Sequence, residues 1–122
     1  SDCHNVHNGN HDFLLTEDNV NDTCYTCHAE KRGPYLWEHA PVTEDCGLCH
    51  EAHGSVHPAS LTRRPPLLCQ QCHSAAGHPA LGYTGDDIES TARQRFLLSR
   101  SCMNCHSQVH GSNHPSGSSQ VR

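Results

Sequence analysis

Four copies of the pattern Cys-x-x-Cys-His constrain this chain more than any other feature of its sequence. They are Cys24-Cys27-His28, Cys46-Cys49-His50, Cys69-Cys72-His73 and Cys102-Cys105-His106. The pattern is typical of covalent c-type haem attachment, in which two thiols form thioethers with the porphyrin and the adjacent histidine binds the iron. Zinc ribbons also use Cys-x-x-Cys pairs, but zinc gives no reason for a histidine after every second cysteine. The motifs therefore predict four covalently bound haems.

The first residues contain the second half of a further motif. Cys3 is followed directly by His4, and the missing first cysteine would lie one position before Ser1. This interpretation also accounts for the odd total of nine cysteines, which a disulfide framework would leave with one unpaired thiol. The alternative is a free Cys3 thiol beside an unrelated histidine. We expect a fifth haem here, and a chain that is part of a longer protein.

The composition leaves little material for an ordinary apolar core. Of the 122 residues, 34% are hydrophobic and 5% aromatic, and the mean hydropathy is −0.71. A chain this short and polar buries too little apolar surface to fold on side chains alone, so we expect the flat, apolar haems to form the core. The predicted fold class is a multihaem cytochrome c, mostly irregular with short α-helices, a haem-array core and little or no β-structure.

The motifs recur at intervals of 22, 23 and 33 residues, counted between their first cysteines, which is typical of an array. We expect one haem domain over residues 1–110 and a flexible tail over 111–122, which is rich in glycine and serine. Asp22 with Thr23, and Thr43, are predicted to cap the turns that carry Cys24 and Cys46. The longest helix is expected over residues 86–102.

The second axial ligand of each iron determines whether a haem can bind small molecules or only transfer electrons. Thirteen histidines less the five proximal ones leave eight candidates. Six of them form three His-x-x-x-His pairs, and the other two stand alone: His7/His11, His53/His57, His110/His114, His39 and His78. We expect His39, His78 and the first member of each pair to be the distal ligands, each serving a neighbouring haem. The only methionine, Met103, lies between two attached cysteines, so every haem is predicted to be a low-potential bis-histidine haem.

Charge and cysteine content restrict the partners and the compartment. The formal net charge is −5, and two propionates on each haem would make it more negative, so nucleic acid is an unfavourable partner. No stretch approaches the roughly 18 apolar residues of a membrane span. Cytochrome c maturation takes place beyond the cytoplasmic membrane, and a high cysteine content fits an oxidising compartment. The sequence therefore predicts export to the periplasm or beyond.

Three segments resemble a known family over nearly the whole chain. They are "CYTCHAEKRGPYLWEHAPVTEDCGLCHEAHGS", "LLCQQCHSAAGHP" and "RSCMNCHSQVHGSNHPSG". They resemble the C-terminal pentahaem half of the MtrA/DmsE-type decahaem cytochromes, periplasmic subunits that insert into a porin-like outer-membrane barrel. The resemblance implies an electron-transfer wire that works with other multihaem cytochromes, is associated with the outer membrane, and exchanges electrons with extracellular acceptors or donors. That family has ten haems in two halves, whereas the first half is absent from this sequence.

Two other function classes remain as alternatives. One is a subunit of an extracellular cytochrome filament, in which self-assembly would bring a histidine such as His11 or His114 to a haem of the next copy. The other is a multihaem reductase. Such enzymes need an open iron, often beside a Cys-x-x-Cys-Lys motif, and that motif does not occur in this sequence. We therefore expect an electron-transfer protein with no catalytic residues.

Overall fold

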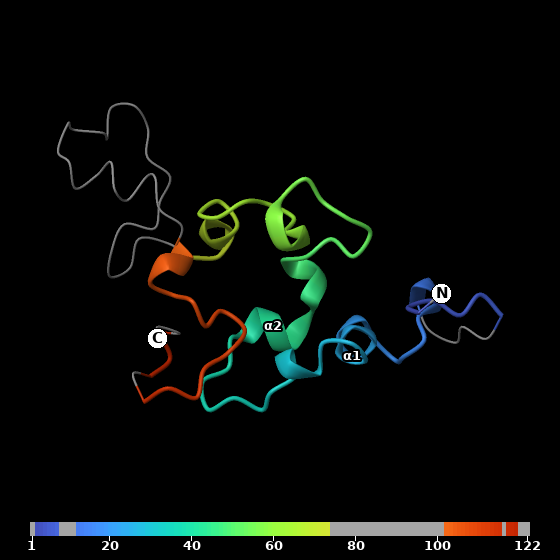
Figure 1. The fold of residues 1–122 in the computed structure, drawn as a ribbon, viewed down its shortest axis with the longest axis horizontal. Coiled ribbons are helices and arrows are strands. Elements are labelled where there is room, and N and C mark those ends of the chain that lie inside the picture. Colours follow the sequence, from blue (N-terminus) through green and yellow to red (C-terminus); the bar gives the residue numbers. More distant parts are fainter. Residues whose placement is uncertain (1, 8–11, 74–101, 116, 120–122) are drawn as a thin grey trace.

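The chain follows an open course in space, with short helices joined by long irregular connections (Figure 1). The computed structural model describes residues 2–7, 12–73, 102–115 and 117–119. The N-terminal segment lies at one end of the ribbon, beyond α1 (Val20–Tyr25), and the chain then runs through α2 (Ala40–Glu44). The last described residues return to the side of the segment that precedes α2 (Figure 1).

All helices of the described residues are short. Besides α1 and α2 there are single turns of 3-10 helix: η1 (Asp12–Leu14), η2 (Ala29–Lys31), η3 (Cys46–Leu48), η4 (Pro58–Ser60), η5 (Cys69–Gln71) and η7 (Cys102–Asn104). In place of strands, the described ranges contain three isolated antiparallel bridges. Within the same ranges, no helix has the length and apolar character needed to cross a membrane. The predicted fold class, irregular with short helices, is confirmed.

α1 begins one turn earlier than the sequence predicts. Asn19 is the N-cap, and its side chain accepts a hydrogen bond of 2.8 Å from the backbone N–H of Asp22. The expected capping role of Asp22 and Thr23 is therefore wrong. Thr23 instead lies inside the helix, where its hydroxyl donates to the carbonyl of Asn19 at 2.9 Å. Asparagine competes well for this position because its short side chain reaches the free N–H groups of the first turn.

Counted from the truncated motif Cys3-His4 as the first, the third motif is Cys46-Cys49-His50, and the turn before it is also capped by a different residue. Thr43 lies within α2, and its hydroxyl donates back to the carbonyl of Ala40 at 2.9 Å. Asp45 caps η3, since its carboxylate accepts a hydrogen bond of 2.6 Å from the N–H of Gly47. The predicted cap at Thr43 is wrong because two short helices, rather than one, occupy this stretch.

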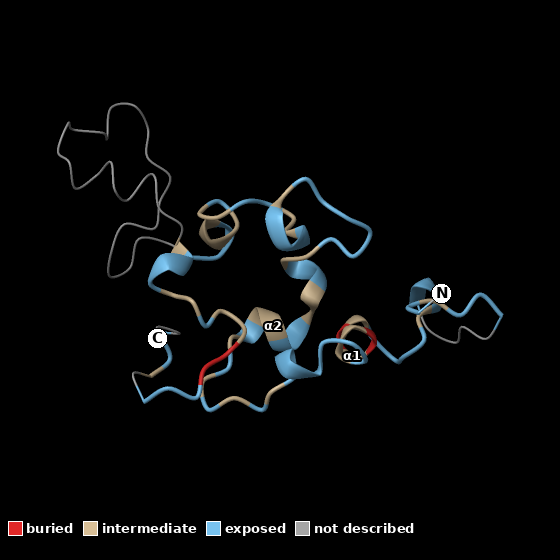
Figure 2. Cartoon of the chain, in the orientation of Figure 1, coloured by how far each residue is buried: buried red, intermediate tan, exposed pale blue. Residues whose placement is uncertain are grey.

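No hydrophobic side chain of the described residues is buried (Figure 2). The buried side chains there are polar, namely Asn21, Thr23 and Ser112, at 8%, 5% and 3% exposure. Large apolar side chains such as Phe13 and Val56 are 79% and 94% exposed. A polypeptide with this distribution lacks the apolar burial that normally offsets the loss of chain entropy. The structure thus agrees with the expectation that the core is supplied by bound haem.

Asn21 joins the second motif to the third. Its amide nitrogen donates to the carbonyls of Val42 and Thr43 at 3.0 and 3.3 Å. Its amide oxygen accepts from the backbone N–H of Cys46 at 2.7 Å. Both hydrogens of the amide nitrogen thus contact α2, and the amide oxygen contacts η3, which lies against α1. Asn21 therefore holds two haem-attachment turns against each other.

Residues 111–114 lie against an earlier part of the chain. Trp37 and Ser112 exchange backbone hydrogen bonds of 2.9 and 3.0 Å in an antiparallel bridge. The Trp37 indole N–H also donates to the carbonyl of His114 at 3.1 Å. Gly111 has φ +133°, and a β-carbon there would collide with the ring of Tyr35. Residues 111–114, expected from sequence to belong to a flexible tail, thus pack against residues 35–37, while the predicted domain boundary stays a prediction.

Part of the sequence-based prediction lies outside the described residues. This holds for the helix expected over residues 86–102, of which 102 alone is described, and for His78, the predicted distal ligand.

Candidate haem-binding sites

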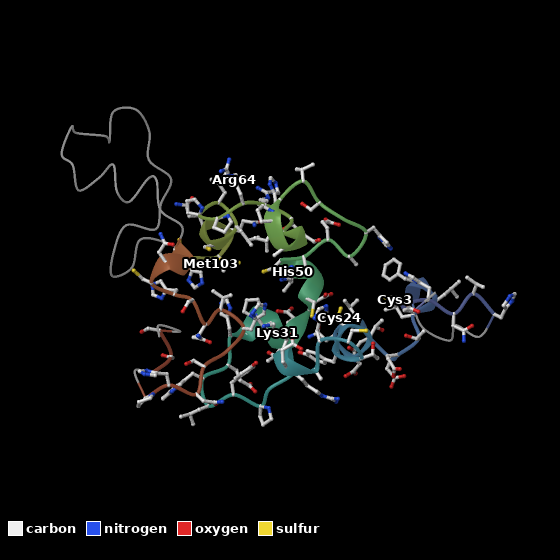
Figure 3. All side chains as sticks on the ribbon, in the orientation of Figure 1. Cys3, Cys24, Lys31, His50, Arg64 and Met103 are labelled. Carbon is white, nitrogen blue, oxygen red and sulfur yellow. The ribbon has the colours of Figure 1, made fainter. Side chains whose placement is uncertain are left out.

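The four complete motifs adopt one common turn. In each, the backbone N–H of the second cysteine donates to the carbonyl of the first at 3.2–3.3 Å, and the N–H of the histidine donates to the same carbonyl at 2.9–3.0 Å. The repeated geometry places two thiols and one imidazole on a single helical turn. Figure 3 shows Cys24 on α1 and His50 after η3, with Cys3 on the N-terminal segment.

The thiols of consecutive motifs are neighbours. In the unmodified chain, burial and then the adjacent Cys24 thiol raise the pKa of Cys46 to about 11. Burial and then the Cys102 thiol likewise raise the pKa of Cys69 to about 11. Within each of these two pairs the side chains lie within hydrogen-bonding reach. The attachment points of the second and third motifs, and those of the fourth and fifth, are therefore adjacent.

Cys49 links the two pairs. Burial raises the pKa of the Cys49 thiol, and the nearby Cys72 thiol adds to the increase. These raised pKa values describe the chain before haem is attached, because a cysteine in a thioether has no thiol proton to lose. Together, these interactions between thiols follow the order in which the four complete motifs occur along the chain.

Backbone carbonyls orient three of the proximal imidazoles. The Nδ1 atoms lie 2.7 Å from the Phe13 carbonyl for His4, 2.8 Å from Ala59 for His50 and 2.6 Å from Ser119 for His106. A ring nitrogen that donates to a carbonyl carries the proton, which leaves Nε2 unprotonated and able to bind a metal. This outer contact is the one that metal-binding histidines normally make. The three side chains therefore fit the role of metal ligands.

His28 has a different outer contact. Its Nδ1 lies 3.6 Å from a carboxylate oxygen of Glu30, and Lys31 lies 3.9 Å from the same oxygen. A hydrogen bond from its own backbone N–H, and then the charges of Lys31 and His28, hold the pKa of Glu30 below its ordinary value. An ionised carboxylate therefore takes the place that a backbone carbonyl takes beside His4, His50 and His106.

Three proximal histidines face a second histidine from another part of the chain. The pairs are His4 with His53, His50 with His110, and His73 with His39. The ring centroids are 6.0, 6.2 and 6.1 Å apart, and the interplanar angles are 15°, 13° and 20°. Because three pairs from different parts of the chain have the same centroid spacing, we interpret them as three copies of one kind of site.

The spacing fits one metal ion between the two rings of each pair. Rings in face-to-face contact would approach to about 3.5–4 Å, so these rings do not touch. Metal–imidazole bonds are about 2 Å long, so centroids about 6 Å apart would leave room for one metal ion bound by both rings. The residues therefore fit a haem iron with two imidazole ligands.

The environments of His39 and His110 support this role. Nδ1 of His39 lies 2.8 Å from the carbonyl of Val109, the same outer contact as at the proximal ligands. Burial, and then the charge of Lys31, lower the pKa of His110. A lowered pKa keeps the imidazole neutral, which is the form that binds a metal.

Residues 3–16 (the first repeat) and 49–62 (the second repeat) have the same local structure. In the first repeat, His4 forms an antiparallel bridge with Leu15. In the second, His50 forms the same bridge with Leu61. Two backbone hydrogen bonds frame each bridge, of 2.8 and 3.0 Å in the first repeat and 2.7 and 2.9 Å in the second. In both, two consecutive residues before the leucine have φ between 51° and 60°. The truncated motif thus has the surroundings of a complete one, which supports a fifth haem site at Cys3-His4.

The structure brings together some of the predicted distal ligands and not others. Each of His39, His53 and His110 faces a proximal histidine. His7 makes no ring contact with the proximal histidines, all of which are described. His78 lies outside the described residues.

Sequence reasoning did not find the residues that position these ligands. Asn21 resembled any polar residue near a helix start, and Gly111 and Ser112 resembled parts of a flexible tail. Their roles depend on contacts with residues 21–25 positions away for Asn21, and 75–76 positions away for the other two. The glycine and serine after His110 recur after His53, and this repetition was the one signal that could have revealed them.

Comparison with known proteins agrees with this geometry. The family described as "Doubled CXXCH motif" matches residues 1–33 and 39–78, which is more than half of the chain. This chain belongs to that family. The first matched stretch contains Cys3-His4 and the second motif, and the next contains the third and fourth motifs. The matched residues therefore cover the truncated motif as well as three of the four complete ones.

A curated multihaem cytochrome is also similar to this chain. The multihaem cytochrome MtrA of Shewanella baltica (strain OS185) is 57% identical over 119 residues, which are 96% of this chain and 36% of the relative. The chain thus spans about a third of the length of the curated relative that it matches. The resemblance drawn from the motifs is confirmed, and so is covalently bound haem c. The chain is a multihaem c-type cytochrome, a class whose haems transfer electrons.

Proposed function

We propose that this chain is a five-haem segment of an electron conduit in which every iron has two histidine ligands. The observation that carries the proposal is the set of three parallel imidazole pairs, each with its centroids 6.0–6.2 Å apart. Each pair joins a proximal histidine to a residue from a different motif region. The proposal assigns His39, His53 and His110 as distal ligands.

Ligands on both sides of an iron determine what the site can do. A haem bound by two imidazoles supplies one-electron redox chemistry at low potential and has no vacant position for a substrate. The chain contributes ligation, ring orientation and tethering, and no described side chain is needed to move a proton or bind a reactant. We therefore propose an electron-transfer role without catalysis.

The order in which the haem-attachment cysteines neighbour one another supports a continuous path for electrons. The thiols of motifs two to five are neighbours in chain order, and His53 and His110 add a second set of links between the first, third and fifth motif regions. Each of these two distal ligands lies next to its own motif and faces the proximal histidine of another. Unfolding one haem region would therefore disturb its neighbours, which favours a rigid array.

The partners and location are proposed from the family resemblance. We propose that the whole protein works in the periplasm at the outer membrane, with other multihaem cytochromes and a porin-like barrel. The absence of buried apolar side chains among the described residues agrees with a protein whose core is haem. The acidic net charge of −5 fits partners other than nucleic acid.

Replacing one distal ligand tests the proposal. In the haem-loaded chain, His39→Ala should convert one haem from low spin to high spin and allow carbon monoxide to bind that haem after reduction. Glu38→Ala, at the exposed neighbouring position, is the matched control and should leave all haems low spin. Paramagnetic resonance and optical spectra measure both effects. An unchanged spectrum in His39→Ala, or carbon monoxide binding to the unmodified protein, would contradict the proposal.

A further inference from the structure

The two proposed distal ligands that lie within repeats both face a histidine from earlier in the chain. His53 belongs to the second repeat and faces His4 of the first. His110 belongs to the third repeat, residues 105–119, and faces His50 of the second. In both cases the first histidine of a His-x-x-x-His pair faces the proximal histidine of the preceding repeat.

The loops that carry these two ligands are alike. Each histidine is followed by a glycine with positive φ, 109° at Gly54 and 133° at Gly111. Each glycine is followed by a serine whose hydroxyl accepts a hydrogen bond of 3.0 Å from the backbone N–H of the second histidine of the pair. The third repeat has one additional residue between its proximal histidine and His110, and the ligand nevertheless faces backward in the same way. The direction is therefore a property of the repeat.

His7 is the corresponding residue of the first repeat. It lies three positions after His4, as His53 lies three positions after His50. The first and second repeats share their bridge, their flanking hydrogen bonds and their left-handed residues. Yet no proximal histidine of the described residues, which include all five, makes a ring contact with His7. By the rule of the repeats, its partner belongs to a repeat that precedes the first.

We infer that His7 is the distal ligand of a haem iron attached outside this chain, in the polypeptide that precedes residue 1. The inference rests on the proposed bis-histidine ligation. The matched segment is 36% of the length of the similar cytochrome, so a relative of this kind has ample polypeptide for another repeat. The neutral imidazole donates a lone pair to the iron, and no proton or electron moves. His7 would thereby fasten this segment to the one before it.

The inference is tested in the longer protein that contains this chain. His7→Ala should add one haem equivalent of high-spin signal and of carbon monoxide binding. The same variant is then made in a C24A/C27A/H28A background, which lacks the haem of the second motif. A high-spin signal in both backgrounds supports the inference. No new signal, or a signal lost in the second background, overturns it, because the latter would show that His7 serves the haem of His28.

The 122-residue chain on its own provides the matched control. There, His53→Ala should add one high-spin haem equivalent, whereas His7→Ala should add none because its iron is absent. If His53→Ala has no effect, the proposed ligation itself fails. If His53→Ala has the expected effect but His7→Ala in the chain equals it, the inference alone is overturned. Self-association of the chain that His7→Ala abolishes would also overturn it, since the iron would then belong to a second copy.

Discussion

Removing the Asn21 side chain should measure how strongly polar contacts hold two haem-attachment turns together. Asn21 is 8% exposed and makes three hydrogen bonds, with the carbonyls of Val42 and Thr43 and the N–H of Cys46. Asn21→Ala deletes all three and leaves their partners without a replacement. Asn21→Asp keeps an acceptor for Cys46 but turns a carboxylate oxygen toward two carbonyls.

The expected loss can be worked from these contacts. A hydrogen bond in a protein contributes about 1 kcal/mol net, and more when a buried partner is left unsatisfied. Three bonds give a loss of about 3 kcal/mol for Asn21→Ala, using about 1 kcal/mol for each. With a urea dependence of about 2 kcal/mol per molar, the midpoint should fall by about 1.5 M. Asn21→Asp should lose at least as much, because its carboxylate repels the carbonyls.

Urea unfolding of the haem-loaded chain, followed by the low-spin haem spectrum and by circular dichroism, measures the two losses. Asn104→Ala, at an exposed position of η7, is the control and should unfold at the wild-type midpoint. A midpoint for Asn21→Ala within about 0.25 M of wild type, equivalent to roughly 0.5 kcal/mol, would refute the reasoning. A higher stability for Asn21→Asp than for Asn21→Ala would refute the assignment of its amide nitrogen as the donor.

Two further outcomes are expected. Gly111→Ala should destabilise the chain more than Gly117→Ala, because both positions have positive φ but a β-carbon at Gly111 also collides with the Tyr35 ring, whereas nothing lies within 4 Å at Gly117. Urea midpoints measure the difference, and equal losses would contradict the proposed close contact. The chain produced without haem attachment should lack a cooperative unfolding transition, since its described residues bury no hydrophobic side chain and folding is then coupled to the bound group. A cooperative transition of that apo chain in circular dichroism would show that the polypeptide has a core of its own.

Local features of the fold were predictable to different degrees. The Cys-x-x-Cys-His turns form as expected because each depends on residues within one helical turn. The caps were misplaced by three residues at α1 and by two at η3, since several capping residues lie close together and their side chains compete for the same N–H groups. The pairing of Trp37 with Ser112 was not foreseen, because a glycine- and serine-rich segment gives no local indication of a contact 75 residues away.

The sequence by itself determined the cofactor, its covalent attachment and the absence of an ordinary apolar core, because the chemistry of each motif and the overall composition do not depend on how the chain is folded. It also reduced the distal ligands to eight candidates. The tertiary structure alone decided which of them face which proximal histidines. A distal ligand must reach the opposite face of a haem from its proximal ligand, so it comes from another region of the chain. Which region arrives there depends on long-range contacts such as those of Asn21 and Ser112, and spacing along the sequence does not encode them.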